Sequence, residues 1–309
     1  MYVQLGYIAK MHIQRWQIGD CTLTSVVEDE VPRVPVQAFF PQASAADVAR
    51  HRWLVPDYAD EKGRLIFRVQ AFVLELHGRR IVIDPCVGNA KRRELPAWNN
   101  KQTPFLERLR SADFAPDAID TVIHTHLHAD HVGWDTHFDN GSWVPTFTRA
   151  RHLYTRRELE YRKRETSDLE DVYADSVAPI LAAGLADIVD DDADLGDGLQ
   201  LESTPGHTPG HVSLWLRSQS DTALVTGDFL HHPVQCAELN WAEFADDDAD
   251  LARTTRRRML ERATELGALF VGTHFPTCPA GRLHRDGDVF RFVAEPSSLG
   301  RPQRLRSSD

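Results

Sequence analysis

The sequence predicts an α/β fold in which strand-like and helix-like segments alternate along the chain. Short apolar runs rich in β-branched residues predict the strands, and amphipathic stretches between them predict the helices. The 309 residues, 42% of them hydrophobic, are enough to bury a large core. Because no composition change, internal repeat or low-complexity tract marks a boundary, we expect one domain over residues 1–309.

Strands are predicted wherever a short aliphatic run is bounded by turn-forming residues. Two of these runs are joined by "HGR", which predicts a hairpin. One run enters a Gly/Pro loop, "TPGHTPGH", and the last run is expected to be the final strand of the fold. The predicted strand segments are residues 13–20, 21–29, 68–76, 79–85, 118–126, 199–211, 211–218, 222–228 and 268–276.

Helices are predicted between these runs, the first of them with Ser44 as its N-cap. The Pro-rich stretch 31–42 is expected to be an extended loop that carries Phe39 and Phe40 outward. Two acidic runs, near Asp190 and Asp246, are expected to be solvated turns and a helix N-terminus. The predicted helices are residues 44–54, 103–113, 157–165, 169–184 and 247–266.

The overall charge and the cysteines limit the classes of function. A formal net charge of −11 argues against a nucleic-acid-binding protein, which needs a basic face. The four cysteines are scattered and form no CxxC pair, which fits a reduced, cytoplasmic setting. No apolar run is long enough for a membrane span, and the N-terminus lacks a signal-peptide pattern. Residues 1–12 are expected to be a disordered or extended lead-in, with Met1 and Met11 both candidate starts.

The segment "VIHTHLHADHVGW" carries the strongest functional signal. An apolar run ends in it, and a turn after His126 would let His126, His128, Asp130 and His131 converge. Imidazole nitrogens and carboxylate oxygens are common ligands of zinc and similar divalent ions. The pattern therefore predicts a metal site.

Three further apolar runs also end in metal-type residues: "LQLESTPGH" in His207, "TALVTGD" in Asp228 and "ALFVGTH" in His274. In α/β proteins sites gather beyond strand ends, where loops converge, so these residues are expected to join the same site. A single histidine at a strand end is more often structural or solvent-facing. That interpretation is preferred for four other histidines, His124, His152, His211 and His232.

The combination of HxHxDH with these three strand ends resembles the metallo-β-lactamase-fold hydrolases. The resemblance covers nearly the whole chain and implies a four-layer αββα sandwich with a metal pair at one edge. It implies two divalent ions, with zinc the first candidate and manganese, cobalt or iron as alternatives. By this resemblance the first metal is bound by His126, His128 and His207, the second by Asp130, His131 and His274, and Asp228 bridges both.

The complete ligand set distinguishes branches of this family. Resistance β-lactamases commonly lack the bridging aspartate, whereas this chain has Asp228. Diiron relatives resemble HxExD, with glutamate where His128 stands, and persulfide dioxygenases lack part of the second-metal set. RNA-processing relatives usually carry an inserted domain. The pattern is closest to N-acyl-homoserine lactonases and to methyl parathion hydrolase-like enzymes.

The resemblance implies a hydrolase that opens a lactone ring with a metal-bridging hydroxide. The alternative is an organophosphate or aryl-ester hydrolase; a β-lactamase and a non-catalytic metal-binding protein are less favoured. The substrate is expected to be a small ester or lactone, without nucleic-acid or membrane partners, and similar lactonases are often homodimers. Catalytic roles are implied for Asp228 and His231, with a share in proton transfer for Asp130; His232 competes with His231.

Two further sequence features bear on the site. In similar enzymes an aspartate like Asp84 orients a ligand histidine from outside the metal shell. Cys86 replaces a glycine that the family often shows nearby, which puts that turn in question. Aromatic residues near the N-terminus either line an acyl pocket, as in similar lactonases, or pack on the sandwich or form a dimer contact. These aromatic residues are Phe39, Phe40, Trp53 and Tyr58.

Overall fold

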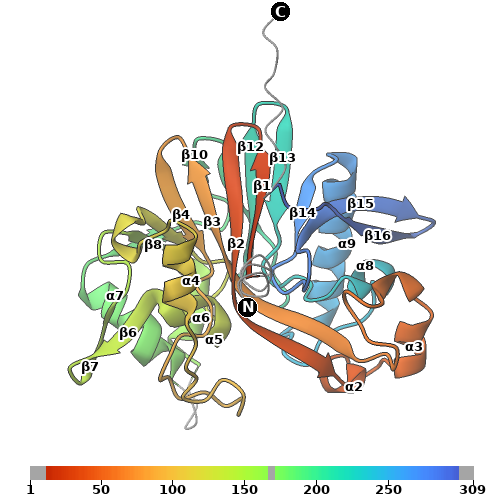
Figure 1. Cartoon of the computed structure of the whole chain (residues 1–309), viewed down its shortest axis with the longest axis horizontal. Helices are drawn as coiled ribbons and strands as arrows, with labels where there is room; N and C mark the ends of the chain where they lie inside the picture. The colour runs from red at the N-terminus through yellow and green to blue at the C-terminus, as the bar shows by residue number, and fades with distance from the viewer. Residues whose placement is uncertain (1–11, 166–170, 299–309) are drawn as a thin grey trace, which may run out of the picture.

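The computed structural model describes residues 12–165 and 171–298 and shows two sheets packed face to face with helices outside them (Figure 1). The predicted α/β class and the four-layer sandwich are both confirmed. The expected N-terminal lead-in lies, except for its last residue, outside the described residues. None of the described helices combines the length and apolarity needed to cross a membrane.

The first sheet contains seven strands in the order β1-β2-β3-β4-β5-β8-β9. The hairpin predicted around "HGR" is present as the antiparallel pair β3–β4, and β4, β5, β8 and β9 run parallel. The strands are β1 (Ile13–Ile18), β2 (Cys21–Val34), β3 (Leu65–Leu76), β4 (Arg79–Ile83), β5 (Thr121–Ile123), β8 (Arg151–Thr155) and β9 (Ala186–Val189).

The second sheet also has seven strands, in the chain order β10 to β16. Its neighbours are antiparallel except for the parallel pair β13–β14. The strands are β10 (Asp194–Gly196), β11 (Leu199–Ser203), β12 (Val212–Ser218), β13 (Asp221–Val225), β14 (Leu269–Val271), β15 (Ala280–Asp286) and β16 (Val289–Ala294). A separate hairpin consists of β6 (Thr136–Asp139) and β7 (Ser142–Pro145).

Most described helices are short, and they lie outside the two sheets. Ser44 is confirmed as an N-cap: its side chain accepts from Asp47 N–H in a capping box. The α-helices are α2 (Val36–Phe39), α3 (Ala45–Ala49), α4 (Phe105–Ser111), α5 (Ala129–Val132), α6 (Arg156–Arg162), α7 (Ala178–Ala182), α8 (Val234–Ala237) and α9 (Ala249–Glu265). Shorter turns are 3-10 at Arg52–Leu54, Pro116–Ala118 and Gly133–Asp135 and π-helical at Tyr173–Val177.

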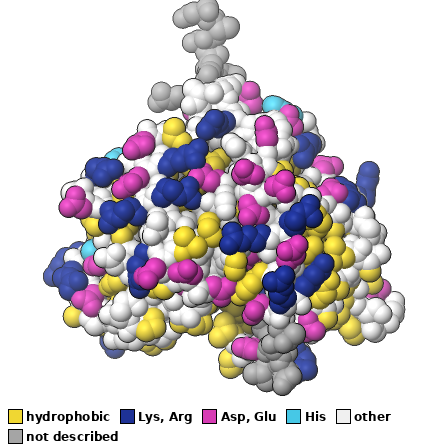
Figure 2. All heavy atoms as spheres, turned by 180° about the vertical axis from the view of Figure 1, so that it is seen from behind, with side chains coloured by type: hydrophobic (Ala, Val, Ile, Leu, Met, Phe, Trp, Pro, Cys, Tyr) yellow, Lys and Arg dark blue, Asp and Glu magenta, His cyan; other side chains and the backbone are white. Residues whose placement is uncertain are grey.

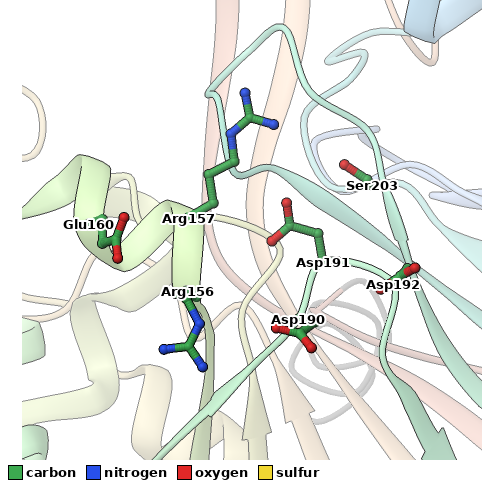
Figure 3. Close-up of a pocket in the computed structure, with 7 residues that line it drawn as sticks. All are labelled: Arg156, Arg157, Glu160, Asp190, Asp191, Asp192 and Ser203. Atoms are coloured by element: carbon green, nitrogen blue, oxygen red, sulfur yellow. The ribbon is translucent and has the colours of Figure 1, made fainter.

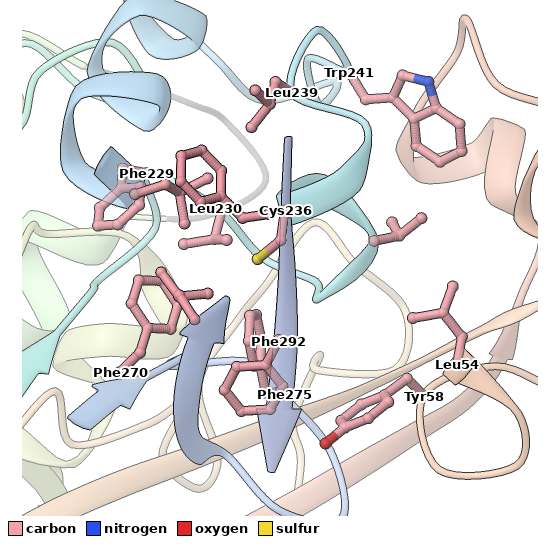
Figure 4. Packing of buried hydrophobic residues seen from close by; sticks show 14 of the residues in the cluster. Leu54, Tyr58, Phe229, Leu230, Cys236, Leu239, Trp241, Phe270, Phe275 and Phe292 are labelled. Carbon is pink, nitrogen blue, oxygen red and sulfur yellow. The ribbon is translucent and has the colours of Figure 1, made fainter. Parts of the chain in front are cut away.

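Three apolar layers hold the sandwich together. Between the sheets, Phe72 of β3 belongs to the same buried cluster as Leu214 of β12. Outside the first sheet, Phe105 of α4 packs on it, and outside the second sheet Met259 of α9 does the same. Figure 4 shows the outer cluster on the second sheet, in which Phe270, Phe275 and Phe292 meet residues of the loop after β13. Burial of each large side chain contributes about 1.5–3 kcal/mol.

The interpretation of residues 31–42 as an extended loop was wrong. β2 continues to Val34, and α2 follows it. Phe40 is fully buried and Phe39 is half-buried, so neither ring projects outward as expected. The reason is the outer apolar cluster on the second sheet, which includes Phe40, Leu54 and Tyr58. Packing in this cluster removes from water the aromatic rings that an isolated loop would expose.

The prediction that residues 268–276 hold the final strand was also wrong. β14 ends at Val271, and the antiparallel strands β15 and β16 follow it in the same sheet. Their mixed sequences conceal the strand pattern, because only one face of the hairpin is buried. Phe290 and Phe292 of β16 face the core, whereas Arg291 between them is exposed.

Candidate metal centre

The short strand β5 carries the first group of predicted ligands just beyond its C-terminal end. His126 and His128 lie in the turn after Ile123, and His128 stands immediately before α5. Asp130 and His131 lie in the first turn of α5. Four potential ligands therefore follow one another within six residues after β5.

The second sheet supplies the other three predicted ligands from its own strand ends. His207 follows β11, Asp228 follows β13 and His274 follows β14. Because β13 and β14 are parallel neighbours, their C-terminal ends lie at the same edge of the sheet. The described structure therefore brings all seven predicted ligands together at the edge where the two sheets meet.

These residues form two groups of three whose potential ligand atoms lie within 4.8 Å of one another. One group is His126, His128 and His207, and the other is Asp130, His131 and His274. The ring nitrogens approach closely: His207 Nε2 lies 2.9 Å from His128 Nδ1, and His274 Nε2 lies 3.3 Å from His131 Nε2. His126, His131 and Asp228 form a further such group, so the two sets adjoin each other.

Asp228 lies between the two groups. Its Oδ2 atom is 3.7 Å from Nε2 of His126 and of His207, 3.1 Å from His131 Nε2 and 3.2 Å from His274 Nε2. Burial alone would raise the pKa of this carboxyl, but the surrounding histidines, led by His131 and His274, hold it well below its usual range. Asp228 is therefore a carboxylate at neutral pH, with one oxygen directed at both groups.

Contacts on the far side of each ring direct these histidines toward the centre. His131 Nδ1 lies 3.0 Å from Asp84 Oδ2, and His274 Nδ1 lies 2.7 Å from the Arg68 carbonyl. His126 Nδ1 lies 3.1 Å from Thr125 Oγ1. In each ring this leaves Nε2 for the centre, the arrangement typical of metal-binding histidines.

The donor set fits divalent cations. His126 Nε2 and Asp228 Oδ1 are buried without a hydrogen-bond partner. Burial and the neighbouring histidines lower the pKa of His126 and His128 well below its usual value, so both rings are neutral, as metal ligands must be. Buried lone pairs that face one another are unfavourable unless a cation or a proton lies between them.

Asp84 takes the place that its sequence context suggested. Besides its contact with His131, its carboxylate accepts hydrogen bonds from Thr125 N–H (2.8 Å) and Thr125 Oγ1 (2.7 Å). Asp84 and Cys86 have φ values of +52° and +46°, in the region that favours glycine. Cys86 thus keeps the glycine-like turn despite its side chain, and Asp84 remains directed at the ligand segment.

The two neighbouring histidines after Asp228 are separated by their surroundings. His231 Nε2 lies 2.9 Å from Asp228 Oδ2, and its ring stacks on His274 with centroids 5.3 Å apart. His232 points away: its Nε2 lies 2.8 Å from the Tyr58 carbonyl, and its Nδ1 accepts from Val234 N–H. His231 is therefore the histidine of the pair that borders the candidate centre.

Sequence reasoning missed two carboxylates at the site. Glu243 Oε1 lies 2.6 Å from His207 Nδ1, and its Oε2 lies 3.5 Å from His231 Nε2. Asp246 Oδ1 lies 3.3 Å from His207 Nδ1, and its side chain is 1% exposed. The acidic run at Asp246 lies at a helix N-terminus as expected, with Asp248 as the N-cap of α9, but Asp246 itself is buried against His207. Its burial follows from the position of the loop between α8 and α9, which no sequence pattern places at the centre.

The other acidic run behaves as predicted. Asp190 and Asp192 are exposed in the turn between β9 and β10. They line a surface pocket of about 460 Å³ with Arg156 and Arg157 of α6 (Figure 3). None of the seven predicted ligands lines this pocket, so it is separate from the candidate centre.

A second group of potential ligands, His124, Asp135 and His152, is also buried. Asp135 is 2.9 Å from His124 Nε2 and 3.1 Å from His152 Nδ1, and it accepts a hydrogen bond from Tyr154. His124 Nδ1 also lies 3.0 Å from the Leu153 carbonyl. These contacts connect β5, β8 and the turn after α5, which supports the structural interpretation of both histidines.

Comparison with known proteins gives a family and a set of relatives. A sequence model of the metallo-beta-lactamase superfamily matches residues 66–274, more than half of the chain. An N-acyl homoserine lactonase from Bacillus thuringiensis is 30% identical over 154 residues, which is 50% of this chain and 54% of the relative. The chain thus spans about half the length of the curated relatives it matches.

Solved structures match over more of the chain. AidC, a dizinc quorum-quenching lactonase in complex with the product N-hexanoyl-L-homoserine, superposes with a TM-score of 0.76 and 17% identity, over 92% of this chain and 97% of AidC. The hydrolase AbOPH superposes with a TM-score of 0.77 and 20% identity, over 93% and 98% of the two chains. At these identities the likeness establishes the shared fold.

Proposed function

The chain belongs to the metallo-β-lactamase superfamily, and from that premise we propose that it is a two-metal hydrolase that opens lactone rings. N-acyl homoserine lactones are the first substrate class to test, because the curated relatives are named for them. The observation that carries the proposal is Asp228, whose Oδ2 lies within 3.7 Å of histidines from both groups. A carboxylate in that position suits a pair of cations better than a single one.

Under this proposal His126, His128 and His207 would hold one ion, Asp130, His131 and His274 the other, and Asp228 both. Zinc is the first candidate for these N/O ligand groups, with manganese, cobalt and iron as alternatives. Two divalent cations supply a nucleophile from water at neutral pH and polarise a substrate carbonyl oxygen. The reaction adds one water across the ring ester and yields a hydroxy acid.

The chain's own residues would orient the substrate and manage the proton. His231 borders the centre through its contact with Asp228, so we assign it to the substrate carbonyl, where a donor stabilises the developing negative charge. Asp130 is half-buried, and its Oδ2 lies 3.6 Å from His274 Nε2. We assign Asp130 a share in passing a proton to the leaving oxygen as the ring opens.

Aromatic rings beside His231 suit an apolar substituent on the substrate. The Phe39 ring lies 5.2 Å from the His231 ring, 4.5 Å from Phe67 and 5.6 Å from Phe244. Phe244 is 58% exposed, so part of this aromatic group faces water. An acyl chain lying against these rings would cover surface that is otherwise in water. The same flat faces suit an aryl group, so an aryl ester or aryl phosphotriester is the second candidate.

The direct test measures hydrolysis by zinc-loaded protein. Opening of N-decanoyl-homoserine lactone is followed beside an aryl ester and an aryl phosphotriester, with Asp228→Asn as the control. The proposal predicts lactone opening that is lost in Asp228→Asn. A protein that carries its full metal complement and opens no lactone would contradict it, and faster turnover of an aryl substrate would then favour the second candidate.

The rings of Phe39, Phe67 and Phe244, here called the aromatic wall, lead to a separate prediction about the length of the substrate's acyl chain. Phe244→Ala should raise the KM for the decanoyl lactone about tenfold, equivalent to about 1.4 kcal/mol, and leave the butanoyl lactone within about twofold. Phe138→Ala is the matched control, because Phe138 is a phenylalanine with 54% exposure on the separate β6–β7 hairpin. Equal effects on both lactones, or an equal effect of the control, would remove Phe244 from the binding wall.

A further inference from the structure

We propose that His211 is a positioning residue that sets the direction of Asp228 through a closed ring of hydrogen bonds. His211 contacts no other predicted ligand through a hydrogen bond among the described residues; its ring instead binds the backbone at Asp228. The proposal rests on the proposed two-metal function, because that function requires the Asp228 carboxylate to reach both ligand groups. It also explains the second histidine of "TPGHTPGH", which belongs to neither ligand group.

The ring of hydrogen bonds begins and ends in the turn that follows β13. Asp228 N–H donates to His211 Nε2 at 2.7 Å, and His211 Nδ1 lies 2.8 Å from Thr204 Oγ1. Thr204 Oγ1 lies 3.0 Å from Ser213 Oγ, which donates to the Thr226 carbonyl at 2.7 Å. The chain of bonds thus runs from Asp228 back to Thr226, two residues earlier in the same turn.

Each donor in this ring has a defined direction. A backbone N–H can only donate, so His211 Nε2 carries no proton and accepts. His211 Nδ1 then carries the proton and donates to Thr204 Oγ1, which leaves the Thr204 hydroxyl to donate to Ser213. His211, Thr204, Ser213 and Thr226 are all 0% exposed, so water does not compete for any of these bonds. The ring is fully satisfied and accommodates one arrangement of protons.

The turn itself is built around the His211 ring. Gly227, between Thr226 and Asp228, has a φ of +59°, and a Cβ atom there would lie 2.5 Å from His211 Nε2. Glycine is therefore needed for both the conformation and the close approach. The imidazole packs on the peptide before Asp228 and accepts from the Asp228 N–H. It therefore fixes the backbone from which the Asp228 carboxylate projects.

The consequence is specific to the carboxylate. Asp228 Oδ2 has to reach both ligand groups, which requires its backbone to be held to within a few tenths of an ångström. Loss of the His211 acceptor leaves the Asp228 N–H buried and unpaired and lets the turn shift. The more weakly bound of the two ions should then lose affinity, since contacts outside the metal shell typically change metal affinity by about 10- to 100-fold.

Two variants of His211 test the contacts of its two nitrogen atoms separately. His211→Asn carries an amide near the position of Nδ1, so it can still bond to Thr204 but offers Asp228 N–H no acceptor. His211→Gln carries an amide oxygen near the position of Nε2 and restores that acceptor. His232→Asn is the control, since His232 is also buried but bonds to Tyr58 and Val234.

The readout is the visible spectrum of the cobalt-substituted protein and the affinity for its second cobalt ion, neither of which needs a substrate. We expect His211→Asn to change the spectrum and weaken the second ion about 10- to 100-fold. His211→Gln should recover most of that loss, and His232→Asn should keep the wild-type spectrum. Kinetically, His211→Asn should lower kcat with little change in KM.

An unchanged spectrum and affinity in His211→Asn would overturn the proposal, as would an equal change in His232→Asn. If His211→Asn fails to fold, Ser213→Ala breaks the same ring at its far side and should change the spectrum in the same direction; no change would overturn the proposal. A wild-type protein that binds fewer than two cobalt ions would overturn the two-metal function as well. Two bound ions without lactone opening would leave the inference standing and the substrate wrong.

Discussion

His231 and His232 are adjacent in the chain, yet their rings have different roles in the structure. His231 borders Asp228, whereas both nitrogens of His232 are occupied by backbone groups. The same principle separates His207, whose Nδ1 contacts two carboxylates, from His211, whose Nε2 accepts a hydrogen bond from a backbone N–H. The partner on the second nitrogen therefore decides what a buried histidine can do, and that partner comes from distant segments that the sequence pattern does not identify.

His232 makes a pH-dependent prediction. Burial lowers its pKa to about 4 in the folded state, below its ordinary value of 6.5. Below pH 6.5 the unfolded chain therefore binds a proton that the folded chain excludes. The associated stability is complete above pH 6.5 and is lost as the pH falls toward 4, by about 3 kcal/mol.

The measurement is urea unfolding of chelator-treated protein at pH 7 and pH 5, so that metal release contributes nothing. His232→Asn keeps an acceptor for Val234 N–H but cannot titrate. Its free energy of unfolding should fall less between the two pH values than that of the wild type. An equal fall in both proteins would show that the His232 proton does not contribute.

At the scale of elements, strand ends explain what could be predicted. Each of the strands β5, β11, β13 and β14 is an apolar run followed by a ligand, and this pattern is local, so the seven candidate ligands could be read from the sequence. The segment between Asp228 and α9 could not be, because it has no periodic pattern. It carries Glu243 and Asp246 to His207, and bonds from α9 and from the segment after β2 hold it there.

The missed elements have the same explanation. β15 and β16 are strands because β15 pairs with β14 and β16 pairs with β15, not because their own sequences are strongly apolar. Phe40 is buried because the second sheet offers an apolar surface to the segment after β2. In both cases tertiary contacts decide the outcome, which a sequence taken alone does not contain.

Arg256 of α9 makes several of the bonds that hold this segment. It is 1% exposed, and its guanidinium donates to the carbonyls of Phe229, Leu239 and Trp241. Arg256→Met would remove the guanidinium donor from all three carbonyls, although that of Trp241 also accepts from Gln235 Nε2, at a cost of about 3 kcal/mol. It should also reduce hydrolysis, because His231 and Glu243 lie in the segment that Arg256 holds.

The measurement for Arg256 is urea unfolding together with hydrolysis of the best substrate. Arg257→Met is the matched control: Arg257 is the next residue on α9, and it is exposed. We expect the control to remain within about 0.5 kcal/mol of the wild type. If both variants lose the same stability, the three carbonyl bonds do not hold the segment.

For the whole molecule, the candidate centre lies where the two sheets meet. The first sheet supplies His126, His128, Asp130 and His131, and the second supplies the remaining three. Cations at this edge would link the two halves of the sandwich in addition to the apolar layer between them. On the face in Figure 2, the acidic and basic side chains of the described residues are interspersed.

This arrangement predicts that metal stabilises the entire fold. At a free zinc concentration 100 times the dissociation constant, each independently bound ion should add about 2.7 kcal/mol to the free energy of unfolding. The Tm of chelator-treated protein should therefore rise with added zinc, and that of a variant with both His126 and His274 changed to alanine should rise much less. A wild-type Tm that does not change with zinc would contradict a centre shared by both sheets.

Seven side chains are proposed to form one centre for two metal ions, and the number of bound ions tests this most directly. That number is obtained by elemental analysis after the protein is saturated with zinc and freed of excess metal. We expect two zinc ions per chain. One ion or none at saturation would contradict the two-metal centre, because the second group of ligands would then be an assembly of histidines and a carboxylate that binds no metal.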